Sequence, residues 1–435
     1  MKDCFVTALY LLRVLYPYRP FLDDYIQYNV YSLHPNPLQT VFLGAGTFTT
    51  RPAANFFDIV LFSHFGKILY IPYLFFVLMY LAFVLMLRSL LRSLGLPVGS
   101  VFLIITLLCP LNIEATLWVS ASTRIVSGLF FGVLSAHIAQ KARGLLSMAL
   151  FFLVNLFSLL FYEQAAVFTF LLVVLISVCK GKKAFSLIAG LNGLAVAGFY
   201  YAFRNYGVFS SRLSSADLLH TASGVQNILT CAKSCVYTLF PDIWLCVFFA
   251  VAGLLLRTRY CNGGYSFYKL IFGVAVLVLT LFPLSVFKGY NIPFRCLLVP
   301  LVGIAVAMDC IAGERLYRIL CIALVAVFIS SGIYEFARFD RSTKYDESVV
   351  EAIASEVGEG QNVSLSLYGT KAYYEPSLSN HAEHIASVTS SDWAITGALR
   401  AKLSDPYFPM VTFEGDGDIK VYFDDTGTKI KSVQR

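Results

Sequence analysis

Two adjacent carboxylates, Asp23 and Asp24, follow the first apolar segment of the chain in the stretch RPFLDDYIQY, residues 19–28. Two like charges at such close range raise the pKa of one of them, which prepares a carboxylate to accept a proton or to bind a divalent cation. The simpler alternative is that both are solvated loop residues. The pair is therefore a candidate general base, to be weighed against the rest of the sequence.

A second polar segment is CPLNIEATLWVSASTRIVSG, residues 109–128, where Glu114, Trp118 and Arg124 interrupt an apolar hairpin. A charged side chain inside a bilayer costs about 2.5–3.5 kcal/mol on insertion scales, so each one near a membrane segment needs a reason. Trp118 has an ordinary role as an interfacial anchor, and Glu114 and Arg124 are near enough in sequence to pair with each other. A ligand-binding cluster is the functional alternative.

Two further segments carry unusual polar groups. Glu163 and Gln164 lie in FYEQAAVF, where one apolar run leads directly into the next, and VFKGYNIPFRCLLVP places Lys288 and Arg295 at the ends of two later runs. Each residue alone is explained as a turn residue or as a long side chain that reaches the membrane surface. Cations also bind anionic ligands, and we expect the four segments to converge on one membrane face.

The sequence carries no signature of a soluble enzyme. It has no glycine-rich phosphate loop and no HExxH pair, and its six histidines are scattered without metal-site spacing. Cys231 and Cys235 are four residues apart, as on one helix face, but without His or Cys neighbours they do not predict a metal site. None of the ten cysteines lies beyond Cys321, so the hydrophilic tail has no disulfide framework.

The composition places these segments in a membrane protein. The 435 residues are 58% hydrophobic and 14% charged, whereas an average soluble domain is about 45–50% apolar and about 25% charged. Apolar runs of about 17–22 residues match a bilayer, and the first run lacks a cleavage site, so we expect it to be retained. The runs predict eleven spans, at 4–18, 68–87, 97–110, 122–139, 145–162, 164–179, 184–203, 240–256, 267–287, 294–311 and 316–333.

The basic residues indicate how these spans are oriented. This role explains the net charge of +7 better than a role in nucleic-acid binding does. Lysines and arginines gather in alternate short loops, which the positive-inside rule places in the cytoplasm. These are the loops with Arg88 and Arg92, Lys141 and Arg143, Lys180, Lys182 and Lys183, Arg257 and Arg259, and Arg315 and Arg318. The loops at 19–67, 111–121, 204–239 and 288–293 are then external, as are the tail and all four polar segments.

The external parts have their own patterns. The second half of loop 19–67 has near-helical spacing and predicts an interfacial helix. In the tail we predict helices at 346–357 and 391–403, a strand at 361–369 and a hairpin at 420–433. The expected architecture is an all-α polytopic membrane module, residues 1–335, followed by a small external α/β domain, residues 336–435.

The same segments resemble the GT-C membrane glycosyltransferases. The likeness is to O-mannosyltransferases that bear tetratricopeptide repeats and to bacterial glucosyltransferases that decorate surface polysaccharides. Four motifs carry it, in the same order and on the same predicted side: the acidic pair in LDDY, RPAAN from Arg51, the hairpin PLNIEATLWVSASTR, and YEQAAVF. The likeness covers residues 20–180 and is only general beyond. This chain lacks the tetratricopeptide repeats, and its first span is short.

The resemblance implies a reaction. GT-C enzymes transfer a sugar from a polyprenyl-phosphate donor in the bilayer, usually with inversion, and an acidic residue of the first external loop deprotonates the acceptor hydroxyl. Carried onto this chain, Asp23 or Asp24 is the base. Cations stabilise the leaving phosphate and glutamates bind hydroxyls or hold an arginine, so the substrate-binding residues are Arg51, Glu114, Trp118, Arg124, Glu163, Lys288 and Arg295.

The resemblance also implies partners and a location. The donor is a lipid-linked sugar, the acceptor is a glycan, lipid or protein, and no nucleic acid is involved. Asp23 and Asp24 are the ligands if a divalent cation, Mg²⁺ or Mn²⁺, is used. We expect an integral protein of a bacterial plasma membrane with its site on the external side. The alternative is a flippase or a polysaccharide polymerase, which predicts charges at the bilayer midplane and broken helices in paired halves.

Overall fold

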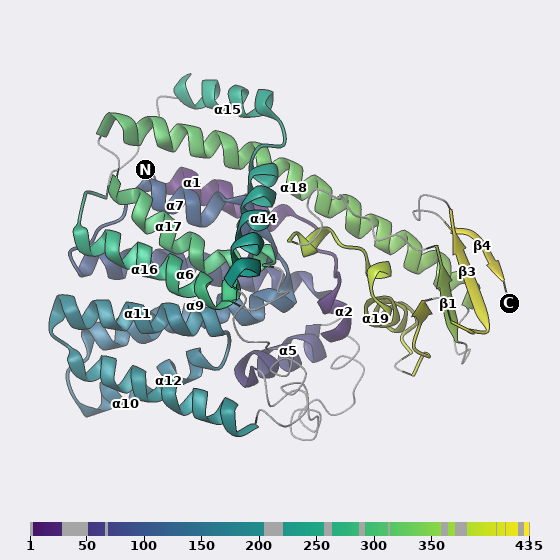
Figure 1. Ribbon diagram of the computed structural model, residues 1–435, viewed down its shortest axis with the longest axis horizontal. Coiled ribbons are helices and arrows are strands. Elements are labelled where there is room, and N and C mark those ends of the chain that lie inside the picture. The colour runs from purple at the N-terminus through teal and green to yellow at the C-terminus, as the bar shows by residue number, and fades with distance from the viewer. Residues whose placement is uncertain are drawn as a thin grey trace.

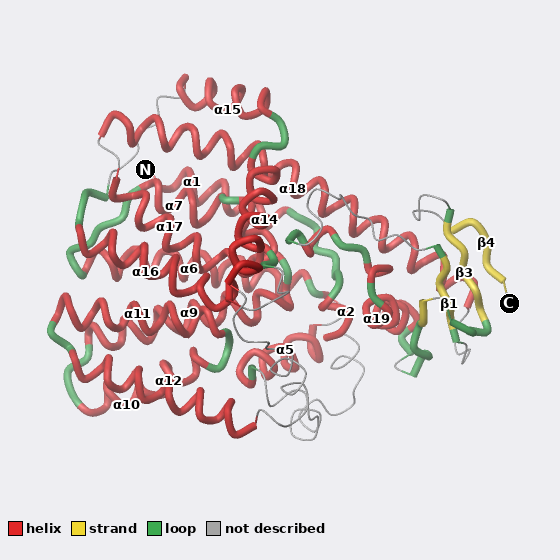
Figure 2. Tube along the Cα trace, viewed as in Figure 1, coloured by secondary structure: helices red, strands yellow, loops and turns green. Residues whose placement is uncertain are grey.

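The computed structural model describes residues 3–27, 51–65, 68–203, 221–255, 263–286, 292–311, 314–357, 364–369, 381–405, 407–413, 415–424 and 430–434. Figure 1 shows long helices lying side by side in one bundle, with the N-terminus at one end of it. A single long helix leaves the bundle and leads to a small sheet that holds the C-terminus. Figure 2 shows that the strands are confined to this last part of the chain.

The bundle helices form on the apolar runs because a helix satisfies every backbone polar group internally. Glycines let neighbours approach closely: a Cβ at Gly273 would lie 2.7 Å from the Gly303 carbonyl oxygen, so these two helices pack backbone to backbone. The helices are α1 Asp3–Leu11 with the 3₁₀-helix η1 Leu12–Leu15, α6 Tyr70–Ser93, α7 Ser100–Leu108, α9 Val119–Lys141, α10 Leu145–Leu159, α11 Glu163–Lys180, α12 Lys183–Phe203, α14 Thr221–Leu239, α15 Ile243–Leu255, α16 Phe267–Val286 and α17 Leu298–Ile311.

Four of the described helices are long and apolar enough to cross a bilayer: α6, α9, α11 and α18 (Glu314–Val357). Two bent pairs raise the number to six if each is one span. The first joins α7 to the 3₁₀-helix η4 (Pro110–Asn112) and α8 (Ile113–Leu117) at 50°, and the second joins α14 to α15 at 62°. The fold is thus compatible with an integral membrane protein, and the count of eleven spans stays a prediction.

The longest helix, α18, unites two predicted elements. The apolar run at 316–333 and the helical pattern at 346–357 are parts of one continuous helix of 44 residues. The stretch between them contains neither Pro nor Gly, so its polar residues end the apolar run without ending the helix. The predicted boundary between residues 335 and 336 therefore falls inside α18.

The small domain is built on the C-terminal part of α18. Its sheet has the order β2-β1-β3-β4, with β1 parallel to both neighbours and β3 antiparallel to β4. The predicted strand, helix and hairpin are confirmed, although the hairpin turn lies outside the described residues. The elements are β1 Leu365–Tyr368, α19 Asp392–Leu403, β2 Thr412–Phe413, β3 Ile419–Phe423 and β4 Ile430–Gln434.

Short helices fill the junction between the bundle and the small domain. They are α2 Asp23–Gln27, α5 Pro52–Phe65, η5 Phe294–Leu297, η6 Glu383–Ile385 and η7 Val388–Ser390. The predicted interfacial helix corresponds to α5, and its position relative to a bilayer stays a prediction. Helix α19 packs directly on α2, since a Cβ at Gly397 would lie 2.6 Å from the Tyr25 carbonyl oxygen.

Candidate functional site

Polar side chains from five separate segments meet at the junction, in α2, α5, the α8–α9 connection, η5 and η6. Figure 1 shows α2 and α5 between the bundle and α19. Three of the four polar segments picked out in the sequence contribute directly. The fourth, around Glu163, reaches η5 through neighbouring side chains. The segments therefore meet in space, and their position on one membrane face stays a prediction.

Asp24 is fully buried under the N-terminus of α9. Its Oδ1 accepts a hydrogen bond from the Ser120 N–H at 3.0 Å, and its Oδ2 accepts from the Phe21 N–H at 3.4 Å and from the Tyr18 hydroxyl. The Tyr18 hydroxyl accepts from the Val119 N–H at 3.1 Å, so together they satisfy N–H groups that begin α9. Burial raises the pKa of Asp24 to about 7, although the hydrogen bonds it accepts oppose the rise.

Asp23 has a different environment, although it is the next residue along the chain. Its side chain is half-buried, and no described residue donates a hydrogen bond to its carboxylate. It interacts electrostatically with the Arg295 guanidinium and with the carboxyl groups of Asp58 and Glu383. Of the two adjacent carboxylates, Asp23 is therefore the one that stays available to a ligand.

Arg124, on the first turns of α9, faces α5. Its Nη2 lies 3.0 Å from Oδ2 of Asp58, a buried carboxylate whose Oδ1 accepts from the Thr123 hydroxyl at 2.7 Å. Its Nη1 donates to the Ser120 hydroxyl at 2.9 Å and to the Ser120 carbonyl. This ion pair joins α5 to α9 next to the Asp24 site.

Glu114 does not pair with Arg124, contrary to one interpretation of the sequence. The chain is extended at Trp118, between α8 and α9, so the two residues do not share a continuous helix face. Instead, the buried Glu114 carboxylate accepts from the N–H groups of Arg295 at 3.2 Å and Glu383 at 3.1 Å, and lies 3.5 Å from the Arg295 guanidinium. That guanidinium also pairs with the Glu383 carboxylate. Two glutamates around one arginine thus tie η5 to η6.

His384 completes this cluster by bridging two buried carboxylates. Its Nδ1 lies 3.2 Å from Glu114 Oε2 and its Nε2 lies 2.8 Å from Glu335 Oε2. Glu335 also accepts from Arg338 Nη1 at 2.6 Å. Burial alone lowers the pKa of His384, but the hydrogen bonds and charges of the two glutamates outweigh it and raise the pKa to about 9. His384 is therefore protonated at neutral pH and links α18 to the bundle end.

Arg51 and Glu163 form an ion pair, with 2.9 Å between Nη2 and Oε2. The guanidinium lies over the Tyr162 ring, 4.7 Å from its centroid. The Tyr162 hydroxyl is 3.2 Å from the Cys296 sulfur, which is the residue after Arg295. This pair therefore borders η5, and it brings the RPAAN and YEQAAVF segments into direct contact.

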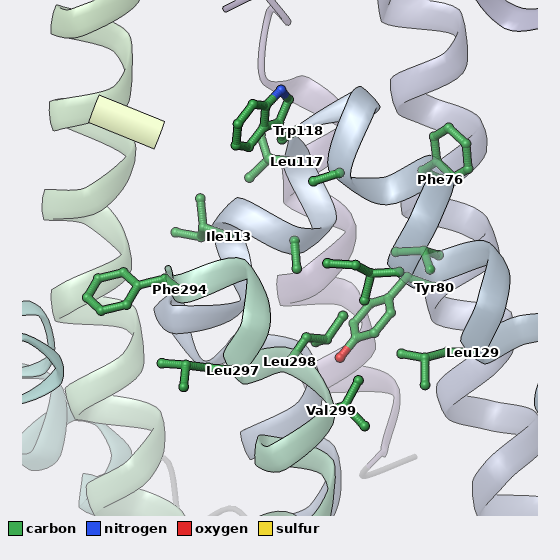
Figure 3. Close-up of a cluster of buried hydrophobic side chains, with 14 of the residues drawn as sticks. Phe76, Tyr80, Ile113, Leu117, Trp118, Leu129, Phe294, Leu297, Leu298 and Val299 are labelled. Carbon is green, nitrogen blue, oxygen red and sulfur yellow. The ribbon is translucent and has the colours of Figure 1, made fainter. Parts of the chain in front are cut away.

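Trp118 lies beneath the Arg295 guanidinium, whose carbon is 5.1 Å from the indole centroid. The Phe21 ring packs on the indole with 4.8 Å between centroids. Figure 3 shows Trp118 and Leu117 at one side of a buried apolar cluster that also contains Phe294. The indole Nε1 is buried and has no hydrogen-bond partner among the described residues. An oxygen atom of a ligand is a suitable acceptor for this N–H group.

One predicted site residue, Lys288, lies outside the described residues. Four residues of the observed site were not predicted from the sequence: Asp58, Glu335, Glu383 and His384. Asp58 did offer a signal, as the one acid in the mostly apolar helix α5. His384 was grouped with scattered histidines because its partners lie 49 and 270 residues away along the chain.

The described residues contain no group of three or more His, Cys, Asp and Glu side chains arranged to hold a metal ion. The acidic pair is not preorganised as a ligand set either, because both Asp24 oxygens already accept hydrogen bonds. Cys231 and Cys235 are both on α14 as free thiols, and the Cys231 sulfur contacts the Ile292 carbonyl at 3.8 Å. The described part of the junction therefore has no preorganised metal site.

Compared with known protein families, curated proteins and solved structures, the chain shows no match. Any functional conclusion therefore depends on the geometry of the junction and on the motifs described above.

Proposed function

We propose that this protein is an integral membrane glycosyltransferase of the GT-C type, which transfers a sugar from a polyprenyl-phosphate donor to a glycan, lipid or protein at the external face of a bacterial plasma membrane. The observation that carries the proposal is the contrast between two neighbouring carboxylates. Asp24 is buried and hydrogen-bonded, whereas Asp23 is accessible and interacts with Arg295. A proton acceptor beside a cation suits transfer from an anionic leaving group.

Asp23 is the general base in this proposal. Its carboxylate takes the proton of the acceptor hydroxyl while that oxygen bonds to the anomeric carbon and the bond from this carbon to the phosphate oxygen breaks. Asp24 is a positioning residue, because its hydrogen bonds to the Ser120 N–H and the Tyr18 hydroxyl hold α2 against α9. Its carboxylate has no exposed surface and so does not meet an acceptor.

The arginines stabilise the charge that develops on the departing phosphate. The side chains of Arg295, Arg51 and Arg124 keep 25%, 20% and 18% exposure, although each one pairs with a carboxylate. A guanidinium has five N–H donors, so donors remain for phosphate oxygens. Glu114 and Glu163 orient Arg295 and Arg51 in this scheme, and Lys288 stays a candidate from the sequence.

A flippase or a polymerase of lipid-linked sugars is the second candidate. The observation that favours it is the presence of two bent helix pairs, at 50° and 62°, because discontinuous helices form the substrate sites of many transporters. Against it, most of the unusual charges gather at the junction, and the buried Lys269–Asp309 pair lies near the ends of α16 and α17 rather than at their middle. A transferase or polymerase forms a new glycosidic bond, whereas a flippase only moves the lipid-linked sugar between leaflets, so one assay distinguishes transfer from transport.

The test is a transfer assay on the purified full-length protein in proteoliposomes, with a panel of polyprenyl-phosphate sugars. We expect Asp23→Asn to lower the transfer rate by about 10²- to 10⁴-fold, the range for loss of a general base, with an unchanged melting temperature. Asp24→Asn should lower the melting temperature as well. The exposed Asp418 provides the control, since Asp418→Asn should change neither quantity.

Full transfer by Asp23→Asn would refute the assignment of the base. Movement of the labelled lipid between leaflets without any glycosylated product would instead favour the flippase, and would refute the transferase proposal itself.

A further inference from the structure

Arg13 is a buried cation outside the junction cluster. It lies on η1, at the end of the first helix, and only 8% of the residue is exposed. Its Nη1 donates to the Thr116 hydroxyl at 2.8 Å, and its guanidinium carbon lies 5.0 Å from the Tyr10 ring centroid and 5.9 Å from that of Phe336. No carboxylate of the described residues lies within ion-pair distance of it. The positive charge is therefore not neutralised by the described protein.

Lys269 provides the comparison, because it is the other buried Lys or Arg side chain of the described residues. Its ammonium group lies 3.1 Å from the Asp309 carboxylate and donates to the carbonyl oxygens of Pro97 and Gly264. Such full compensation is usual, because a buried charge is stable only when it is paired and hydrogen-bonded. Arg13 has one hydrogen bond for five donors. Its aromatic neighbours offset part of the charge, and the missing component is an anion.

The surroundings of Arg13 indicate where an anion comes from. Leu12 and Leu15, on either side of it, are 57% and 78% exposed, which is typical of side chains that face lipid. The Tyr73 hydroxyl donates to the Arg13 carbonyl at 2.7 Å. Tyr73 lies in the first turn of α6, and its ring stacks on that of Tyr18 with 5.1 Å between centroids. Arg13 is therefore near the bundle end that carries Asp24, beside the lipid-facing surface.

We propose that Arg13 anchors a binding site for the phosphate group of a membrane lipid, which enters laterally beside Leu12 and Leu15. The planar guanidinium matches a phosphate with two parallel N–H donors, and the exposed Leu12 and Leu15 side chains are apolar surface for the chain that follows. The phosphate belongs either to an anionic phospholipid or to a polyprenyl phosphate, which share this chemistry. The proposal stands whether or not the protein transfers sugars.

The experiment uses the full-length protein in nanodiscs of phosphatidylcholine, into which phosphatidylglycerol or a polyprenyl phosphate is titrated. Thermal unfolding measures stabilisation, and native mass spectrometry counts the lipids that stay bound. We expect saturable stabilisation of the wild type by at least one anionic lipid and at least tenfold weaker binding by Arg13→Gln. Arg13→Lys, which keeps the charge, should retain part of the affinity.

Arg19→Gln is the matched control. Arg19 lies six residues away but is more exposed and pairs with Asp340 at 2.9 Å, so this variant should bind lipid as the wild type does. Preferential binding of one lipid identifies the source of the phosphate. The proposal is overturned if the wild type shows no saturable dependence on anionic lipid, a result that needs no variant. It is also overturned if Arg13→Gln binds lipid as tightly as Arg19→Gln, or if inorganic phosphate stabilises the protein as well as the lipids do.

Discussion

Deprotonation of His384 should loosen the contact between α18 and the bundle end. The pKa of His384 is about 9 in the folded protein, against an ordinary value of 6.5. The folded state therefore holds a proton that the unfolded state loses between these two values, and stability falls with rising pH across this range. A difference of 2.5 pKa units corresponds to about 3 kcal/mol, with a slope of at most about 1.4 kcal/mol for each pH unit. The contribution is complete below pH 6.5 and lost above pH 9.

The assay is urea-induced unfolding of the purified protein, followed by tryptophan fluorescence at pH 6, 7.5, 9 and 10. His384→Gln should be less stable than the wild type by about 3 kcal/mol at pH 6, because it leaves two buried carboxylates without the cation between them, and the difference should shrink above pH 9. The control is His64→Gln, at an exposed position of α5. The reasoning is refuted if His384→Gln and the wild type lose stability in parallel between pH 6.5 and pH 9.

Two further substitutions test a close helix contact at the junction and the buried ion pair between α16 and α17. Gly397→Ala should destabilise the protein by about 1–3 kcal/mol, since the new Cβ would lie 2.6 Å from the Tyr25 carbonyl oxygen. The control is Gly193→Ala, whose Cβ would have no atom within 4 Å and which should change the unfolding free energy by less than about 1 kcal/mol. Equal effects of the two substitutions in urea unfolding would contradict this. Lys269→Met should destabilise the protein by about 3–5 kcal/mol, because it leaves the buried Asp309 carboxylate without its cation. The double variant with Asp309→Leu should recover only part of that loss, since the Gly99 N–H and the Tyr317 hydroxyl then lose their acceptor. Full recovery of the unfolding free energy in urea would contradict this.

Most of the helices were predictable, because long apolar runs favour a helix that satisfies the backbone internally. Helix α14 was not, since Thr221–Leu239 falls in the predicted external loop 204–239. The small domain was also predictable from alternation and turn residues, as in β3 and β4. The continuity of α18 was not, since hydropathy reports where lipid ends and not where a helix ends. Only the absence of Pro and Gly between 334 and 345 carried that information.

The site was predictable in some of its members but not in its pairs. Asp24, Glu114 and Arg295 stood out as charges near apolar runs, and they do gather at one end of the bundle. Their partners are set by the tertiary fold: His384 reaches Glu114 across 270 residues of sequence. The unequal burial of Asp23 and Asp24 also escaped sequence reasoning, because it depends on how α2 docks beneath α9.

Because α18 is unbroken, a tilt of its first half also moves its far end. At 1.5 Å for each residue its 44 residues extend about 66 Å, and Glu335, which meets His384, is halfway along. Membrane helices tilt when bilayer thickness changes. A rotation of about 10° around that midpoint would move the far tip by roughly 6 Å, while residues near the fulcrum, including the Glu114 cluster, would hardly shift. For a tilt of this kind, the sheet at the tip of α18 moves further than the residues near the midpoint.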